Sequence, residues 1–120
     1  MFRIDNMSRT PIYEQLVDQF EKFILTGALL PGSQIPSVRN LSIQLSINPN
    51  TVQKAYSELD SRSLIYSLPG KGSFVSPDAK ERIESARTSK LDDLAAVVSK
   101  LKEAGIEKEM LISVIDRFYN

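Results

Sequence analysis

One proline divides the middle of this chain into two short helices. Apolar residues recur at helical spacing on both sides of Pro49, but a proline disfavours helical geometry in the residue before it. The pair Asn48 and Pro49 has instead the composition of a helix start, in which asparagine caps free N–H groups and proline takes the first helical position. The sequence therefore predicts two helices that meet at a tight turn.

The two helices expose different side chains. The first is expected to begin at Ser37, with apolar residues directed inward and Arg39 directed outward. The second is expected to bury Val52, Ala55, Tyr56 and Leu59 and to expose Asn50, Gln53, Lys54 and Ser57. For Tyr56 we expect packing in the core with the hydroxyl at the surface. The exposed face carries hydrogen-bonding groups and no acid.

The flanking segments complete a small module. Thr10 as cap and Pro11 as first residue predict an earlier helix, which Gly27 would end. The apolar runs 64–66 and 73–75 flank a glycine-rich basic tip, which predicts a β-hairpin. The alternation over residues 2–4 suggests a short edge strand.

Two more helices are expected in the tail. Ser76 and Pro77 predict the start of a long helix that Gly105 would end, and a last helix follows. The apolar residues expected to mediate dimerisation are Leu91, Leu94, Val98, Leu101, Met110, Leu111, Val114 and Phe118. Such faces need a partner's helices for full burial, although folding back onto the same chain is an alternative. We predict a mainly α fold with a small β wing: a winged helix-turn-helix domain over residues 1–76 and a two-helix dimerisation region over residues 77–120.

Composition excludes several classes of function. The chain has no cysteine and no histidine, so disulfides, zinc fingers and the commonest general base are absent. We find no catalytic residues, no metal ligands and no phosphate loop, and expect no enzyme and no cofactor. The lack of a long apolar run or a signal-like N-terminus predicts a cytoplasmic protein without membrane contact.

Charge is distributed unevenly along a chain whose formal net charge is zero. Neutrality argues weakly against DNA binding, which favours basic domains. No acid lies between Glu21 and Glu58, however, while Lys22, Arg39 and Lys54 do. Either this interval faces phosphates, or the low acid content is chance.

Three helices followed by a basic hairpin are the layout that inserts one helix into the major groove of DNA. The candidate DNA-binding residues are Ser37, Arg39, Asn50, Thr51, Gln53, Lys54, Gly70, Lys71 and Gly72. Hydroxyls at helix starts can reach phosphates, amides can read adenine, and the basic groups can contact guanine or phosphate. The alternative is purely structural: Ser37 and Asn48 as caps, and the two glycines as turn residues.

The order of five motifs resembles the GntR family of bacterial regulators. The motifs are Pro11-Ile12-Tyr13-x-Gln15-Leu16, Gly27-x-Leu29-x-Pro31-Gly32, Pro36-Ser37-Val38-Arg39-x-Leu41, Asn50-Thr51-Val52-x-Lys54-Ala55-Tyr56-x-x-Leu59 and Gly70-x-Gly72-x-Phe74-Val75. The short tail is similar to that of the YtrA-type subfamily. Ser63 stands where relatives usually have glycine, which implies a non-glycine residue in a left-handed conformation.

The resemblance implies a repressor that binds double-stranded operator DNA as a homodimer. Its operator would be an inverted repeat, often before an operon for an ATP-binding-cassette transporter. The resemblance implies DNA contacts at the residues already chosen, apart from Gln53, which is a candidate by its chemistry alone. A small-molecule effector stays open, as does its identity. The competing hypothesis is a winged helix used as a protein-interaction module, which would tolerate changes at Arg39 and Lys54.

Overall fold

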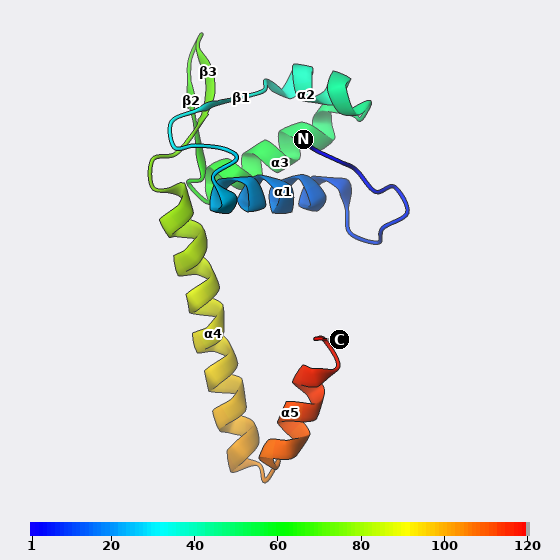
Figure 1. Ribbon diagram of the computed structural model, residues 1–120, viewed down its shortest axis with the longest axis vertical. Coiled ribbons are helices and arrows are strands. Elements are labelled where there is room, and N and C mark those ends of the chain that lie inside the picture. Colours follow the sequence, from blue (N-terminus) through cyan, green and yellow to red (C-terminus); the bar gives the residue numbers. More distant parts are fainter. Residues whose placement is uncertain (120) are drawn as a thin grey trace. The chain divides into compact units, whose positions relative to one another are not determined.

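The computed structural model describes residues 1–119 (Figure 1). Its helices and strands are α1 (Ile12–Thr26), β1 (Gln34–Ile35), α2 (Val38–Leu45), α3 (Pro49–Ser61), β2 (Ile65–Leu68), β3 (Gly72–Val75), α4 (Ala79–Glu103) and α5 (Lys108–Asp116). The predicted mainly α fold with a small β wing is confirmed. Contacts divide the chain into one compact unit through Glu84 and a second from Ser85 onward. The first unit extends past Ser76 because Ala79 and Ile83 are buried in its core.

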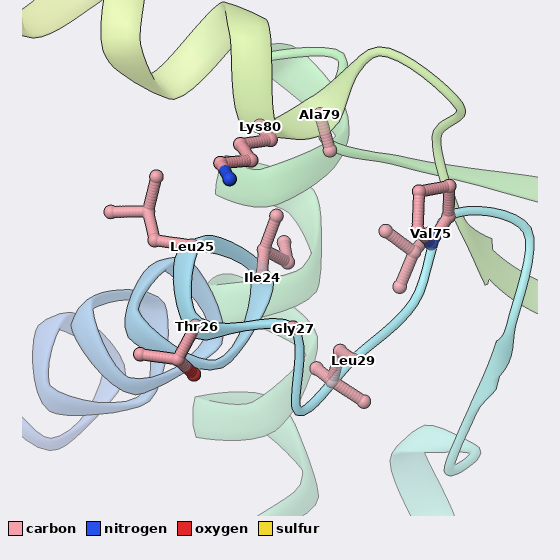
Figure 2. A pocket seen from close by; sticks show the side chains of 9 residues that line it. Ile24, Leu25, Thr26, Gly27, Leu29, Val75, Ala79 and Lys80 are labelled. Atoms are coloured by element: carbon pink, nitrogen blue, oxygen red, sulfur yellow. The ribbon is translucent and has the colours of Figure 1, made fainter.

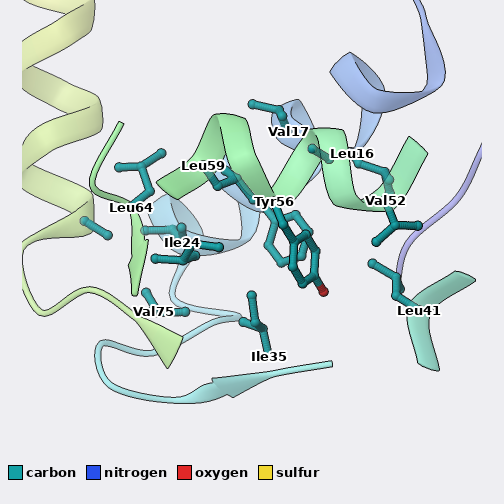
Figure 3. Close-up of a cluster of buried hydrophobic side chains, with 14 of the residues drawn as sticks. Leu16, Val17, Ile24, Ile35, Leu41, Val52, Tyr56, Leu59, Leu64 and Val75 are labelled. Atoms are coloured by element: carbon teal, nitrogen blue, oxygen red, sulfur yellow. The ribbon is translucent and has the colours of Figure 1, made fainter. Parts of the chain in front are cut away.

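The core of the first unit lies around α1 and α3 (Figure 3). Leu16 and Phe20 on α1 are fully buried, as are Val52 and Leu59 on α3. Apolar residues three and four positions apart form one stripe on each helix, so the two stripes can pack face to face. The predicted buried face of α3 is confirmed, since Ala55 and Tyr56 are also buried. The outward face of α3 is thereby left to its polar residues.

Both predicted helix starts around the central turn are confirmed. The N–H of Asn40 donates to Ser37 Oγ at 3.1 Å, and the N–H of Asn50 donates to Asn48 Oδ1 at 2.8 Å. Pro49 is the first residue of α3. The turn also places Ser46 at φ 54°, a left-handed conformation that ends α2. The helix boundaries at this turn are therefore set by interactions between residues close in sequence.

The predicted starts of two other helices were wrong. Pro11 and not Thr10 is the residue that precedes α1, and no side chain caps that end. The Thr10 carbonyl instead accepts a hydrogen bond from the side-chain amide of Gln15. Helix α4 begins at Ala79 and not at Pro77, because Ser76 is held at the end of the sheet, where its N–H donates to the Leu64 carbonyl at 2.9 Å.

The wing is a three-stranded antiparallel sheet in the order β1, β3, β2. The hairpin of β2 and β3 was predicted, and Ile65 pairs with Val75 in its register. Strand β1 was not predicted, because two residues are too few to show an alternating pattern. It pairs Gln34 with Phe74 and fixes the wing to the segment that leads into α2.

The edge strand expected over residues 2–4 is absent; this segment is an extended arm. Side chains of α1 take the place of a neighbouring strand, since the amide of Gln19 bonds both the N–H and the carbonyl of Arg3. Gln15 does the same for Asp5. Phe2 packs on Phe20 with ring centroids 4.6 Å apart. The arm thus satisfies its backbone groups without sheet pairing.

The second unit consists of most of α4 and of α5. Gly105, at φ 89°, follows the end of α4, and the N–H of Ile106 donates to the Leu101 carbonyl, so the predicted helix end is confirmed. No side chain of residues 85–119 is buried. Leu91 is 64% exposed, Met110 59% and Phe118 81%. Over the described residues, no helix combines the length and apolarity needed to cross a membrane.

Candidate nucleic-acid interface

A hydrogen bond from Tyr56 connects α3 to the start of α2. The Tyr56 ring lies in the core, and its hydroxyl donates to the carbonyl of Pro36 at 2.6 Å (Figure 3). The expectation that this hydroxyl lies at the surface was wrong. Burial raises the pKa of Tyr56 above its ordinary value and so further favours the protonated phenol that donates this bond. This contact holds Ser37, the next residue, in a fixed place relative to α3.

The outward face of α3 presents amide and ammonium groups to solvent. Asn50, Gln53 and Lys54 are exposed, and Thr51 is half-buried in the first turn. The side-chain amide of Gln53 donates to Ser57 Oγ at 3.2 Å. The Lys54 ammonium lies 4.0 Å from the centre of the Tyr13 ring. The predicted polar residues thus share one accessible face of the helix.

The first turn of α2 adds a hydroxyl and a guanidinium. Ser37 Oγ accepts the capping bond from Asn40, but its own hydrogen stays available as a donor, so the structural and functional roles are compatible. Arg39 is exposed, and its guanidinium has no hydrogen bond or ion pair with any residue of 1–119. A cation without an internal partner is suited to an external anion.

The tip of the wing is a basic turn with two constrained glycines. The N–H of Lys71 donates to the Leu68 carbonyl, and its side chain is exposed. Gln34 Nε2 donates to the Lys71 carbonyl at 2.9 Å. Gly72 has φ 121°, and a Cβ there would lie 2.5 Å from Gln34 Nε2. The backbone conformation therefore favours glycine at this position, and a side chain there would displace the Gln34 amide.

One acidic group, Asp60, lies at one end of the candidate surface. Asp60 follows Gln53 and Ser57 at helical spacing, and all three line one hollow together with residues of the wing. Ten residues of helix separate Asp60 from Asn50, about 15 Å at 1.5 Å per residue. The beginning of α3 therefore keeps its positive or neutral character while the end does not.

An ion-pair network that the sequence did not predict binds two further acids to one arginine. Arg62 Nη1 lies 2.6 Å from Glu21 Oε1, and Arg62 Nε lies 2.9 Å from Glu58 Oε1. Burial by itself would lower the pKa of Arg62, but the bonds and charges of Glu58 and Glu21 raise it overall. The four-residue spacing of Glu58 and Arg62 was a visible signal; the link to Glu21 on α1 needed the fold.

A separate hollow of about 260 Å³ lies between the end of α1 and the first turn of α4 (Figure 2). Its lining is mostly apolar, including Ile24, Leu29 and Val75, with Lys80 as the charged side chain. In residues 1–119 no three acidic side chains come together in a way that could hold a metal ion. The candidate interface remains the exposed surface of α2, α3 and the wing, because the predicted polar and basic side chains lie there.

Comparisons with known proteins match both the motifs and the fold. The sequence model of a family described as bacterial regulatory proteins, gntR family, matches residues 12–75. The chain is 40% identical over 112 residues to the HTH-type transcriptional repressor YtrA of Bacillus subtilis (strain 168), covering 92% of this chain and 86% of the relative.

Two solved structures extend the comparison. One is YtrA from Sulfolobus acidocaldarius, a GntR-family transcription factor, with a TM-score of 0.63 at 34% identity over 78% of this chain and 97% of that chain. The other is AraR(DBD) in complex with operator ORX1, with a TM-score of 0.55 at 32% identity over 62% of this chain and 92% of that chain. A relative of the N-terminal unit has thus been seen on operator DNA.

Proposed function

The chain belongs to the GntR family of bacterial regulatory proteins, in its YtrA-type subfamily, and we propose that it is a repressor that binds an inverted-repeat operator as a homodimer. Members of the family are transcription regulators, which are not enzymes. One observation carries the proposal: the exposed face of α3 offers amide and ammonium groups beside an unpaired Arg39 on α2. That combination is suited to base edges flanked by phosphates.

Each candidate residue has a role that follows from its chemistry and place. Asn50 and Gln53 would read bases in the major groove, with Thr51 bonding a phosphate at the start of α3. Ser37, Arg39 and Lys54 would contact the backbone on one side of the groove. The wing tip, with Gly70, Lys71 and Gly72, would lie along the neighbouring backbone. The domain assignment is part of this proposal: residues 1–76 bind DNA and residues 77–120 dimerise.

The tail supports a dimer because it has no core of its own. No side chain of residues 85–119 is buried, although apolar residues recur along both helices. Contiguous exposed apolar faces on helices are typical of interfaces between chains. A two-fold dimer would place two copies of α3 on two half-sites, separated by about one helical turn of DNA or a multiple.

The test is selection of bound sequences from random duplex DNA, followed by titration of the best sequence at two salt concentrations. We expect an inverted repeat and a steep loss of affinity with salt. Arg39→Ala should weaken binding to that operator by about 1–3 kcal/mol with an unchanged melting temperature. Lys22→Ala is the matched control, because Lys22 is an exposed cation on α1 outside the candidate residues.

Two outcomes would contradict the proposal. One is no enrichment of any sequence, as expected of a module that binds only proteins. The other is equal affinity of the Arg39→Ala and Lys22→Ala variants. The resemblance to YtrA-type regulators also implies a transporter operon as the target, which the genomic position of the selected operator would test.

A further inference from the structure

We propose that Tyr13 is a positioning residue that holds the Lys54 ammonium at the protein surface for contact with an operator phosphate. The inference deepens the DNA-binding function proposed above and rests on it. It assigns a role to a side chain of α1, which the sequence patterns did not connect with the recognition surface. The role is to order a flexible cation before DNA arrives.

The geometry of the pair is that of a cation–π interaction. Lys54 Nζ lies 4.0 Å from the centre of the Tyr13 ring, within the roughly 6 Å over which the ring's negative face attracts a cation. Tyr13 is half-buried in the first turn of α1, and its hydroxyl donates to Glu14 Oε1 at 3.2 Å. The ring is therefore held by packing on one side and by a hydrogen bond at its tip.

The ring orders Lys54 without neutralising its charge. Lys54 forms no ion pair with any described residue, although Glu14 and Glu58 both lie close enough to Tyr13 to raise its pKa. Glu58 is instead bound by Arg62. An aromatic face leaves the full positive charge for an external anion, whereas a carboxylate partner would cancel it. The three N–H donors of the ammonium cannot all face one ring, so some remain for phosphate oxygens.

Preorganisation is the physical gain. A free lysine side chain has large rotamer freedom, and ordering it on binding costs affinity. A ring that already restricts the side chain in the free protein removes part of that cost. An exposed cation–π contact corresponds to about a two- to fivefold change in affinity.

The experiment measures operator affinity in a double-mutant cycle of Tyr13→Leu and Lys54→Ala. We expect Tyr13→Leu to weaken binding about two- to fivefold in the unaltered background and to have no effect in the Lys54→Ala background. Tyr13→Phe, which keeps the ring, should restore most of the affinity. Combined with Lys71→Ala at the wing, Tyr13→Leu should act additively, because those side chains do not touch.

A second measurement does not depend on DNA binding. In the unaltered protein, NMR should show the ε-methylene protons of Lys54 upfield of those of the other lysines, because the ammonium to which this methylene is bonded lies over an aromatic ring. The shift should persist in Tyr13→Phe and disappear in Tyr13→Leu. A lost shift with intact melting behaviour would separate positioning from folding.

The outcomes distinguish this inference from the function on which it rests. If Lys54→Ala leaves operator affinity unchanged, the DNA contact assigned to Lys54 is wrong and the positioning role of Tyr13 fails with it. The proposed DNA-binding function fails only if no operator sequence is enriched or Arg39→Ala binds as Lys22→Ala does. If Lys54→Ala weakens binding but Tyr13→Leu does not, or acts equally in both backgrounds, the positioning role alone is overturned. A rise in affinity with Tyr13→Leu would also overturn it, because the ring would then be withholding the lysine from DNA.

Discussion

At the tip of the wing, two glycines with left-handed backbones differ in what a side chain would meet. Gly70, at φ 75°, has open space where a Cβ would stand. Gly72, at φ 121°, has the side-chain amide of Gln34 in that place. That amide also bonds the Lys71 carbonyl and so holds the turn. The second glycine therefore carries both a conformational and a packing requirement.

Gly72→Ala should destabilise the protein more than Gly70→Ala. The Gly70 substitution is expected to cost about 1 kcal/mol for its left-handed backbone. The Gly72 substitution adds displacement of the exposed Gln34 amide and loss of its bond, for a total of about 2 kcal/mol. Urea unfolding followed by circular dichroism measures both free energies. Equal losses would mean that the Gln34 contact has no part in holding the wing.

A third residue at the end of α3 has a left-handed backbone although it is not glycine. Ser63, for which the resemblance implied a left-handed conformation in a non-glycine residue, adopts φ 60°. Its N–H still donates to the Asp60 carbonyl at 2.9 Å. The end of α3 is thus formed in the usual way, at the expense of left-handed strain in a residue with a side chain.

Among the elements, α2 and α3 depend on each other through the Tyr56 hydroxyl. Local capping fixes where each helix begins, but it does not fix where α2 lies relative to the recognition face. The bond from Tyr56 to the Pro36 carbonyl does this from inside the core. A change at this buried hydroxyl should therefore affect the arrangement of the elements as well as stability.

Tyr56→Phe should lower the free energy of unfolding by about 1–2 kcal/mol, because it leaves the partly buried Pro36 carbonyl without its donor. Tyr66→Phe is the control, since the Tyr66 ring stacks on Phe74 but its hydroxyl bonds no residue of 1–119. It should be nearly neutral. Thermal melts and urea titrations of both variants measure the two changes in the free energy of unfolding. Similar losses of stability in both variants would show that the Tyr56 bond has no special role.

For the whole molecule, the tail is the part whose apolar side chains are not buried within the described residues of its own chain. Its helices leave Leu91 64% and Leu94 48% exposed, and Val114 on α5 is 40% exposed. Burial of about 25 cal/mol per Å² of apolar surface makes pairing of such faces favourable. We therefore expect the protein to be dimeric at micromolar concentration.

Leu94→Asp combined with Val114→Asp should give monomers, because each charge would have to be buried without a partner. Ser99→Asp combined with Ser113→Asp adds the same charge at exposed polar positions of the same helices and should stay dimeric. Sedimentation velocity measures the mass of each. A dimeric apolar-to-aspartate variant would show that the interface lies elsewhere, and a monomeric unaltered protein would favour the tail's folding back on its own chain.

The sequence by itself determined the features that depend on neighbours along the chain. Pro49 with Asn48 separated two helices, Ser37 capped the first, and the helical spacing around Val52 and Leu59 identified the buried face of α3. These predictions were confirmed because capping, proline geometry and periodicity depend on residues within one or two helical turns of each other. The order of the five motifs also predicted the family, and through it a transcription regulator.

Only the tertiary structure decided the features that join distant residues. Strand β1 exists because β3 offers it partners, and the arm over residues 2–4 is no strand because α1 satisfies its backbone first. The Tyr56 hydroxyl is directed inward because the fold brings the Pro36 carbonyl within hydrogen-bond distance. The two residues are twenty positions apart in sequence, so no local pattern predicts this bond. Lys54 contacts the Tyr13 ring because the packing of α3 on α1 brings the two side chains together. No local sequence pattern predicts these contacts between distant residues, because they arise from how α1, α3 and the wing pack together.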